Sequence, residues 1–262
     1  MVKDPKKGNP FLGPFLSYPQ VWVVELGVLC GVWYNNGNYM AKNKGTKVEN
    51  GKIGAMEIVK KILKWTTIGI FTAFVLLVIA RMPVVYRKQK TEEQVAKIHA
   101  TKLTMDDVMG VNLPPDPGTE ADKTVAGIDA NKNGIRDDVE LAIFEEYPNS
   151  AKTRAVLLQY ALALQMELTQ PFENEKNVTE VVREESRAHS CVADTLVPRK
   201  SPESGRTNAE VKRIDSFINF VEDKQFSTDE RKKAKNDFYE KLRSFGPLDE
   251  VACDIDLSKL PN

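Results

Sequence analysis

The chain has 262 residues, and its 37 basic and 37 acidic side chains give a formal net charge of zero at pH 7. A neutral chain of this kind has no electrostatic signature for nucleic acid, and we expect no nucleic-acid partner. The roughly 175 residues that follow its longest apolar run are enough for one compact domain.

Residues 1–55 form a leader that can be interpreted in two ways. Segment 11–34 is apolar and aromatic but is interrupted by prolines and a glutamate, so it is a candidate second transmembrane segment that precedes a Lys-rich loop. Residues 34–54, rich in Asn, Gly and Lys, show neither a helical nor a strand period, which favours spurious upstream sequence and a start at Met56. Both interpretations stay open.

Residues 62–86 are predicted to form a transmembrane helix, or signal-anchor. No charged residue lies between Trp65 and Arg81. At about 1.5 Å per residue the segment extends roughly 30 Å if Arg81 reaches toward the interface, which is just enough to cross a bilayer. Trp65 and Tyr86 stand where aromatic residues meet the membrane surfaces. The membrane is therefore an expected partner.

Two other interpretations of this run stay open. A helix that is apolar on every face can be a buried core helix, and the basic residues before the run, with Val78 to Ala80, also fit a cleavable signal peptide. Basic residues are more numerous before the run than after it, which favours a cytoplasmic amino end. We therefore expect one or two spans and a main domain on the side of the membrane opposite the cytoplasm.

Residues 87–118 are predicted to connect this span to the domain. We expect a juxtamembrane helix and turn over 91–109, followed by a Pro-rich linker at 113–118. The calcium-stabilised helical domain is expected to cover residues 119–262.

Residues 129–140 fit the calcium-loop pattern D-x-[DN]-x-[DN]-G-x5-E at every defined position. Ca²⁺ needs about six to eight oxygens, and donors at every second residue of a short turn can bring them around one point. Gly134 permits the sharp bend because it has no Cβ. The predicted ligands are the side chains of Asp129, Asn131, Asn133, Asp137 and Glu140 and the main-chain carbonyl of Ile135.

The loop departs from paired EF-hands in three ways. Arg136 stands where such pairs have an apolar residue, the chain contains no second loop, and segment 114–127 is too rich in Pro and Gly for a long entering helix. The loop thus resembles the lone EF-hand-like loops of dockerin and thrombospondin type 3 repeats. Its three carboxylates predict weak binding, roughly 10⁻⁵ to 10⁻³ M, which suits extracellular calcium. The competing interpretation is an Asx-rich turn that caps a helix without metal, with Asp137 or Asp138 as the N-cap residue.

Apolar residues after the loop recur at helical spacing and predict an all-α domain. The expected helices begin at Asp137 or Asp138 and end at 146, and then cover 150–169, 175–196, 208–222 and 228–245. No alternating segment of the β type interrupts them.

Cys191 and Cys253 both follow the span and are predicted to form a disulfide in an oxidising compartment, whereas two unrelated buried thiols are the alternative. Cys30 lies apart. We predict no catalytic residue. His189 and Cys191 stand two positions apart on a helix and so face different sides, and His99 is isolated near the membrane.

From Gly127 to Glu140 the chain resembles a group of uncharacterised bacterial extracytoplasmic proteins. In these, a membrane signal and a Pro-rich stretch precede the calcium-like block, and helices with a late Cys follow it. The resemblance implies a bacterial inner-membrane protein, single-pass or two-pass, with a periplasmic main domain, and it implies no activity. We expect a membrane-tethered calcium-binding structural or partner-binding module, with a protein partner in the membrane or periplasm. The alternatives are a hydrolase-like extracytoplasmic enzyme with an ancillary calcium site, and an accessory subunit of a membrane protein complex.

Overall fold

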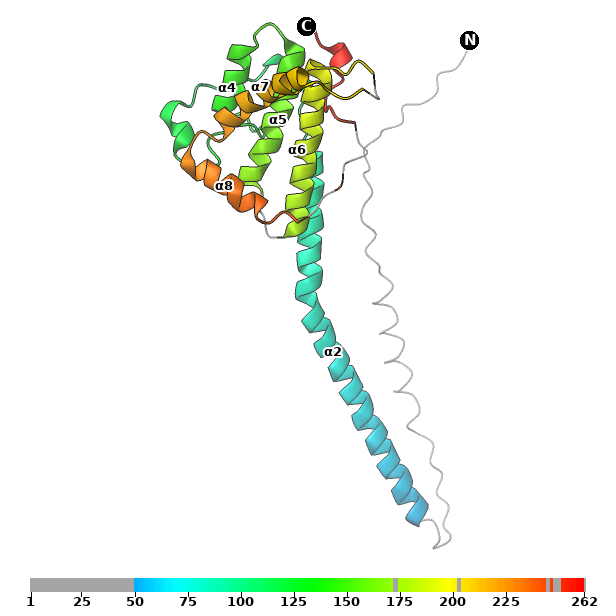
Figure 1. Ribbon diagram of the computed structural model, residues 1–262. Coiled ribbons are helices and arrows are strands. Elements are labelled where there is room, and N and C mark those ends of the chain that lie inside the picture. The colour runs from blue at the N-terminus through cyan, green and yellow to red at the C-terminus, as the bar shows by residue number, and fades with distance from the viewer. Residues whose placement is uncertain (1–49, 172–173, 202–203, 244–245, 247–250, 262) are drawn as a thin grey trace, which may run out of the picture. The chain divides into compact units, whose positions relative to one another are not determined.

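The computed structural model describes residues 50–171, 174–201, 204–243, 246 and 251–261 (Figure 1). These residues form seven α-helices and two short 3₁₀ helices, and no strand occurs among them. The predicted all-α class is therefore confirmed. Segment 11–34 and Cys30 lie outside the described residues. The chain divides between Thr72 and Ala73 into two units.

Helix α2 extends from Asn50 to Ala100 and has Pro83 inside it. By length and composition its segment Met56–Ala100 could cross a membrane, and no other described helix could. All side chains from 56 to 89 are exposed, which argues against a buried core helix. The predicted span and the start of the predicted juxtamembrane helix form one continuous helix. Residues 87–100 are rich in strong helix formers such as Glu, Gln, Lys and Ala, so the helix continues when the sequence becomes polar.

Three short elements follow α2 and lead to the candidate loop. They are α3 (Met105–Met109), the 3₁₀ helix η1 (Gly118–Asp122) and α4 (Asp137–Glu146). Within the segment 91–109, for which a helix and turn are predicted, α2 ends at Ala100 and a new helix begins after Thr104, which caps α3 in a capping box with Asp107. The hydrophobic core also includes Ile98, Leu103 and Val108, which precede the predicted domain 119–262.

Helix α5 (Ala151–Thr169) is the centre of the domain and contacts α3, α4, α6, α7 and α8. It is buried on every face from residue 154 to residue 167, as its apolar sequence on all sides requires. Around it lie α6 (Glu175–Leu196), α7 (Asn208–Gln225) and α8 (Asp229–Tyr239), and the 3₁₀ helix η2 (Leu257–Lys259) follows near the carboxyl end.

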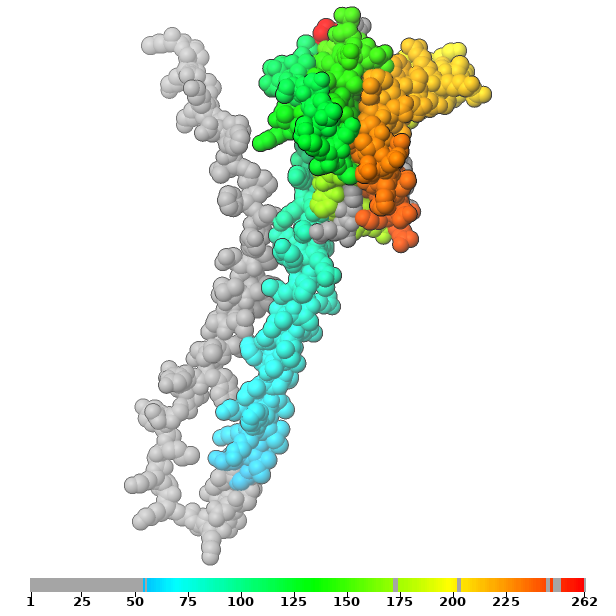
Figure 2. Space-filling view, turned by 90° about the vertical axis from the view of Figure 1, so that its left-hand side faces the viewer, coloured from blue at the N-terminus to red at the C-terminus, as the bar shows by residue number. Residues whose placement is uncertain are grey.

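The predicted bounds agree closely for α4, α5 and α6 and less closely for the last two helices. Helix α7 continues to Gln225, three residues beyond the predicted end. Helix α8 ends at Tyr239, where the chain enters a turn whose hydrogen bonds run from Lys241 N–H to the Phe238 carbonyl and from Leu242 N–H to the Tyr239 carbonyl. Figure 2 shows α8, in dark orange, at the surface of the domain beside α7.

Candidate functional site

The candidate calcium loop, residues 129–140, lies between η1 and α4, and its last four residues form the first turn of α4. The backbone turns sharply at Lys132 and Gly134, which have positive φ angles of 59° and 87°. A Cβ at position 134 would lie 2.7 Å from the Leu162 side chain of α5. Glycine is therefore needed both for the bend and for the packing of the loop on the core.

Side-chain oxygens at the first three predicted ligand positions are held inside the turn by the loop's own backbone. Asp129 accepts hydrogen bonds from the N–H groups of Asn133 (3.1 Å) and Gly134 (3.0 Å). Asn131 Oδ1 accepts from the Asn133 N–H at 3.3 Å, and Asn133 Oδ1 accepts from the Ile135 N–H at 2.8 Å. The alternating Asx residues thus direct their oxygens to the interior of one tight loop.

The last two predicted ligands, Asp137 and Glu140, are each only 1% exposed. The Asp137 carboxylate accepts hydrogen bonds from the Ala130 N–H at 3.0 and 3.2 Å. Glu140 Oε2 accepts one from Asn131 Nδ2 at 3.0 Å, and the same amide donates to the Asn112 carbonyl at 3.0 Å. Both carboxyl groups therefore join the network of the loop, and Asn131 connects that network to the segment after α3.

The surroundings of these two acids disfavour their charged forms. Burial raises the pKa of Glu140 to about 7, although the hydrogen bond from Asn131 acts to lower it. Burial also raises the pKa of Asp137, with the Ala130 N–H opposing the shift and the nearby Asp129 carboxylate adding to it. A cation at the centre of the loop would reverse both effects.

Arg136, the residue that departs from paired EF-hands, is fully buried and turned toward α7. Its guanidinium bonds Asp138 at 2.5 and 2.9 Å and the main-chain carbonyls of Lys224 (2.6 Å) and Gln225 (3.0 Å). It therefore ties the loop to the end of α7. No local pattern predicts this role, because the two carbonyls lie 88 and 89 residues away.

The donor set of the loop consists of oxygens alone, which suits a hard cation such as Ca²⁺. Within the described ranges, however, no three His, Cys, Asp or Glu side chains gather closely enough to hold a metal ion. Three of the predicted ligands are carboxylates, and the other predicted donors are amide and carbonyl oxygens.

A buried ion network joins the end of α2 to α6. The two ring nitrogens of His99 face Glu184 Oε1 at 2.9 Å and Glu180 Oε2 at 3.2 Å, so the ring bridges two carboxylates. The prediction that His99 is isolated is thus wrong. Its partner Glu184 lies 85 positions away, and the spacing of residues near His99 cannot reveal such a contact.

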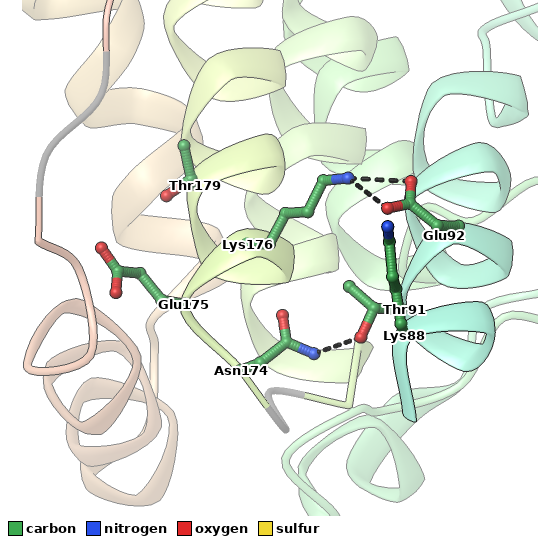
Figure 3. A pocket seen from close by; sticks show the side chains of 7 residues that line it. All are labelled: Lys88, Thr91, Glu92, Asn174, Glu175, Lys176 and Thr179. Carbon is green, nitrogen blue, oxygen red and sulfur yellow. Dashed lines mark hydrogen bonds and ion pairs between the residues drawn. The ribbon is translucent and has the colours of Figure 1, made fainter. Parts of the chain in front are cut away.

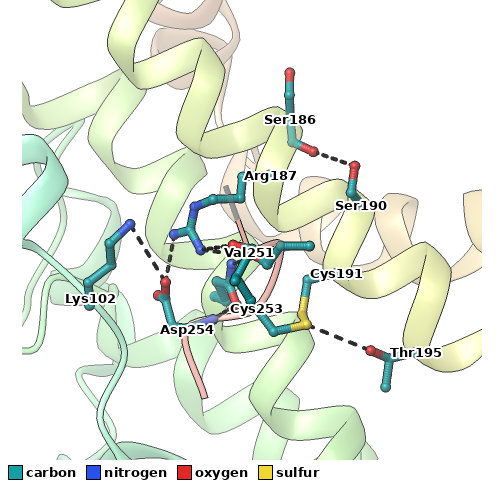
Figure 4. Close-up of a disulfide and its surroundings, with 11 residues drawn as sticks. Lys102, Ser186, Arg187, Ser190, Cys191, Thr195, Val251, Cys253 and Asp254 are labelled. Carbon is teal, nitrogen blue, oxygen red and sulfur yellow. Dashed lines mark hydrogen bonds and ion pairs between the residues drawn. A yellow bond between two sulfur atoms is a disulfide. The ribbon is translucent and has the colours of Figure 1, made fainter. Parts of the chain in front are cut away.

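Glu184 also binds the cations Lys102 (2.9 Å) and Arg187 (2.6 Å). Arg187 in turn pairs with Asp254 at 2.6 Å and donates to the Ala252 carbonyl at 3.0 Å (Figure 4). Burial acts to raise the pKa of Glu184, but the hydrogen bonds from Lys102, Arg187 and His99 bring it below its ordinary value. The network therefore holds a buried carboxylate in its charged form.

Beside this network, Cys191 and Cys253 form the predicted disulfide, with a Cα–Cα distance of 5.0 Å (Figure 4). The bond attaches the carboxy-terminal segment to α6. Since Cys191 is consumed in it, a nucleophile made of His189 and Cys191 does not exist in this structure. His189 is exposed and packs its ring edge-to-face near Tyr160.

A hollow of about 550 Å³ lies where α2 meets the start of α6 (Figure 3). Lys176 donates to both oxygens of Glu92 at 2.8 Å, and Asn174 Nδ2 donates to Thr91 Oγ1 at 2.8 Å. A smaller hollow of about 220 Å³ beside His189 includes Arg206 and Asp194, which pair at 2.6 Å. The groups that line these hollows thus bind one another and do not form a nucleophile–base arrangement.

Comparisons of the chain with protein-family models, curated proteins and solved structures found no match.

Proposed function

We propose that the protein is a membrane-tethered helical module, stabilised by one calcium ion, whose main domain lies outside the cytoplasm. The observation that carries the proposal is the loop 129–140, in which the alternating side-chain oxygens turn inward onto the loop's own N–H groups. An Asx-rich turn that served only as a helix cap needs a single capping oxygen. The N-cap residue of α4 is instead Arg136, which makes no side-chain cap.

Six residues would hold the ion, and each contributes oxygen. They are the side chains of Asp129, Asn131, Asn133, Asp137 and Glu140 and the carbonyl of Ile135. Calcium, when bound, supplies positive charge to the two buried carboxyl groups and cross-links the approach to α4 with its first turn. Its role is structural, since the hydrogen bonds of Asn131 already connect the same parts of the chain.

The extracytoplasmic placement is supported by two features. A disulfide persists in an oxidising compartment, and a loop with three carboxylates suits a place where calcium is plentiful. Protease added to intact spheroplasts should digest the domain. Protection of the domain until the membrane is disrupted would contradict the placement.

The tether is supported by α2, whose apolar side chains are exposed along 56–85. An intact amino end in membrane fractions is expected. A mature protein that starts at Arg81 would instead identify the run as a removed signal peptide.

A structural or partner-binding role is favoured over an enzyme, because the described hollows hold charges that neutralise one another. An apolar surface for a protein partner lies next to the loop, formed by the exposed side chains of Met109, Val111 and Leu113. The loop contacts this segment through the hydrogen bond from Asn131 to the Asn112 carbonyl. An accessory-subunit role depends on segment 11–34 and stays a prediction.

Thermal unfolding of the full chain in detergent tests calcium stabilisation. A ligand that binds only the folded state stabilises it by RT ln(1 + [L]/Kd), or about 2.7 kcal/mol at about 100 times Kd, which raises Tm by about 5–10 °C. Glu140→Gln should lose the shift, and Glu145→Gln, at an exposed position of the same helix, should keep it. Equal Tm with calcium and with chelator in the parent would refute the proposal.

A further inference from the structure

A second group of ionisable residues, two of them buried and four half-buried, lies between α5, α6, α7 and α8, in a part of the domain distinct from the candidate loop. We call it the acid–phenol cluster. It consists of Tyr160 and Glu167 of α5, Glu185 of α6, Glu222 of α7, and Lys235 and Tyr239 of α8. Three carboxyl groups and two phenols thus share the neighbourhood of one lysine.

The contacts of Tyr239 require an additional proton. Its hydroxyl oxygen lies 2.6 Å from Glu185 Oε2 and 3.2 Å from Glu167 Oε1. A phenol has one proton and can donate one hydrogen bond, so the second contact needs a proton on one of the two carboxyl groups. If both carboxyl groups were ionised, the Tyr239 hydroxyl oxygen and one carboxylate oxygen would face each other with no proton between them.

The second oxygen of Glu167 points to the same protonation. Glu167 is completely buried, and its Oε2 has no hydrogen-bond partner. A bare oxygen of an ionised carboxylate is costly at such a site, whereas a neutral acid is tolerated. Burial and the nearby Glu185 carboxyl raise the pKa of Glu167 to about 9, against the lowering effects of Lys235 and Tyr239.

The remaining charged groups of the cluster do not neutralise this pair. Lys235 pairs with Glu222 at 3.2 Å and lies over the Phe226 ring, while Tyr160 donates to Glu222 at 2.9 Å. Burial also raises the pKa of Glu185, although Tyr239, Lys235 and the exposed His189 oppose the shift. One lysine therefore faces three acids as soon as the shared proton leaves.

The two ends of helix α8 are attached to the domain by different interactions. At its amino end the buried Arg231 binds Asp122 at 2.5 Å and the carbonyls of Thr124 and Val125 at 3.2 Å. At its carboxyl end the hydroxyl of Tyr239 contacts the two acids, next to the buried Phe238 ring. Only the second attachment depends on a proton.

We propose that Glu167, Glu185 and the Tyr239 hydroxyl form a proton-binding site that fastens the carboxyl end of α8 to the bundle and releases it when the proton leaves at alkaline pH. The Arg231 end stays attached. Release would expose the surfaces of α5 and α6 that α8 covers.

Hydrogen exchange of the full chain in detergent, followed by mass spectrometry, tests this proposal. After correction for the chemical exchange rate, protection of residues 234–239 should fall at least about tenfold between pH 7 and pH 10, because one lost proton changes the opening equilibrium by up to about tenfold per pH unit. Protection within α5 should stay unchanged over the same range. Constant protection of α8 in the parent would overturn the proposal.

Two variants identify the proton. Glu167→Gln keeps a neutral group that can donate to the phenol and should retain α8 protection at pH 10, whereas Glu145→Gln, exposed on α4, should behave as the parent does. An equal fall in Glu167→Gln and in the parent would refute the site. If Glu167→Gln does not fold, Glu185→Gln places an amide on the other side of the Tyr239 hydroxyl. This variant should also retain α8 protection at pH 10, and a fall equal to that of the parent would refute the site.

Discussion

Glu184 and Glu185 are neighbours on α6, yet their carboxyl groups enter opposite surroundings. Glu184 lies in the ion network with Lys102, His99 and Arg187, where hydrogen bonds overcome burial and lower its pKa. Glu185 lies in the acid–phenol cluster, where burial raises its pKa. The contrast teaches that burial alone does not decide the charge of an acid in this domain. The cations that the fold places beside a buried acid decide whether that acid is charged.

The candidate loop belongs with the second kind of surroundings. Burial raises the pKa of Glu140 to about 7, and Arg136 of the same loop bonds Asp138 and α7 instead of Glu140. A buried carboxyl group without a protein cation keeps a proton or takes a metal ion. The acid–phenol cluster contains only carboxyl groups and phenols around its lysine, so we assign a proton to it. The loop combines carboxylates with amide and carbonyl oxygens in a tight turn, so we assign calcium to the loop.

Removal of Arg187 should have the largest effect on stability. Arg187→Ala leaves Glu184 and Asp254 buried with fewer cations, and breaking a buried ion pair from one side costs about 3–5 kcal/mol. Arg183→Ala provides the matched control on the same helix, since Arg183 is partly exposed and pairs with Glu180 alone, and should cost below about 1 kcal/mol. Denaturant unfolding measures both, and equal losses would contradict the importance of the network.

The disulfide should contribute nearly as much. Its sequence separation of 62 predicts that replacing both cysteines, Cys191→Ser with Cys253→Ser, lowers the free energy of unfolding by about 4 kcal/mol. The bond holds Asp254 beside the ion network and does not touch the acid–phenol cluster. Calorimetry should therefore show a lower Tm with an unchanged dependence on alkaline pH, and a changed alkaline slope would break the distinction between the two regions.

The two regions should limit stability at opposite ends of the pH range. The folded pKa of Glu167, about 9, lies above its ordinary value of 4.5, so the folded state keeps a proton that the unfolded state loses. This stability is complete below pH 4.5 and is lost as pH rises toward 9, by at most about 1.4 kcal/mol per pH unit. Glu184 has a lowered pKa, so its contribution is present above 4.5 and is lost as pH falls below that value.

Melting curves at several pH values check this opposition. Glu167→Gln should flatten the alkaline decline of Tm and leave the acid decline in place. If both declines persist unchanged in that variant, Glu167 is not the group that titrates.

Features fixed by neighbouring residues could be predicted from the sequence, and features fixed by distant contacts could not. Helix α6 has the predicted bounds because Asn174 caps its first turn, and the turn at Gly134 follows from local backbone sterics. The bridge at His99, the contact of Arg136 with α7 and the contact of Tyr239 with Glu167 join residues 72 to 89 positions apart. No local period encodes such contacts, because they exist only when the helices have packed.

Calcium binding by the loop is tested most directly by calorimetric titration of the full chain in detergent. We predict one Ca²⁺ per chain with Kd of roughly 10⁻⁵ to 10⁻³ M, and no binding by Glu140→Gln. Absence of binding by the parent, or equal binding by the variant, would contradict the account.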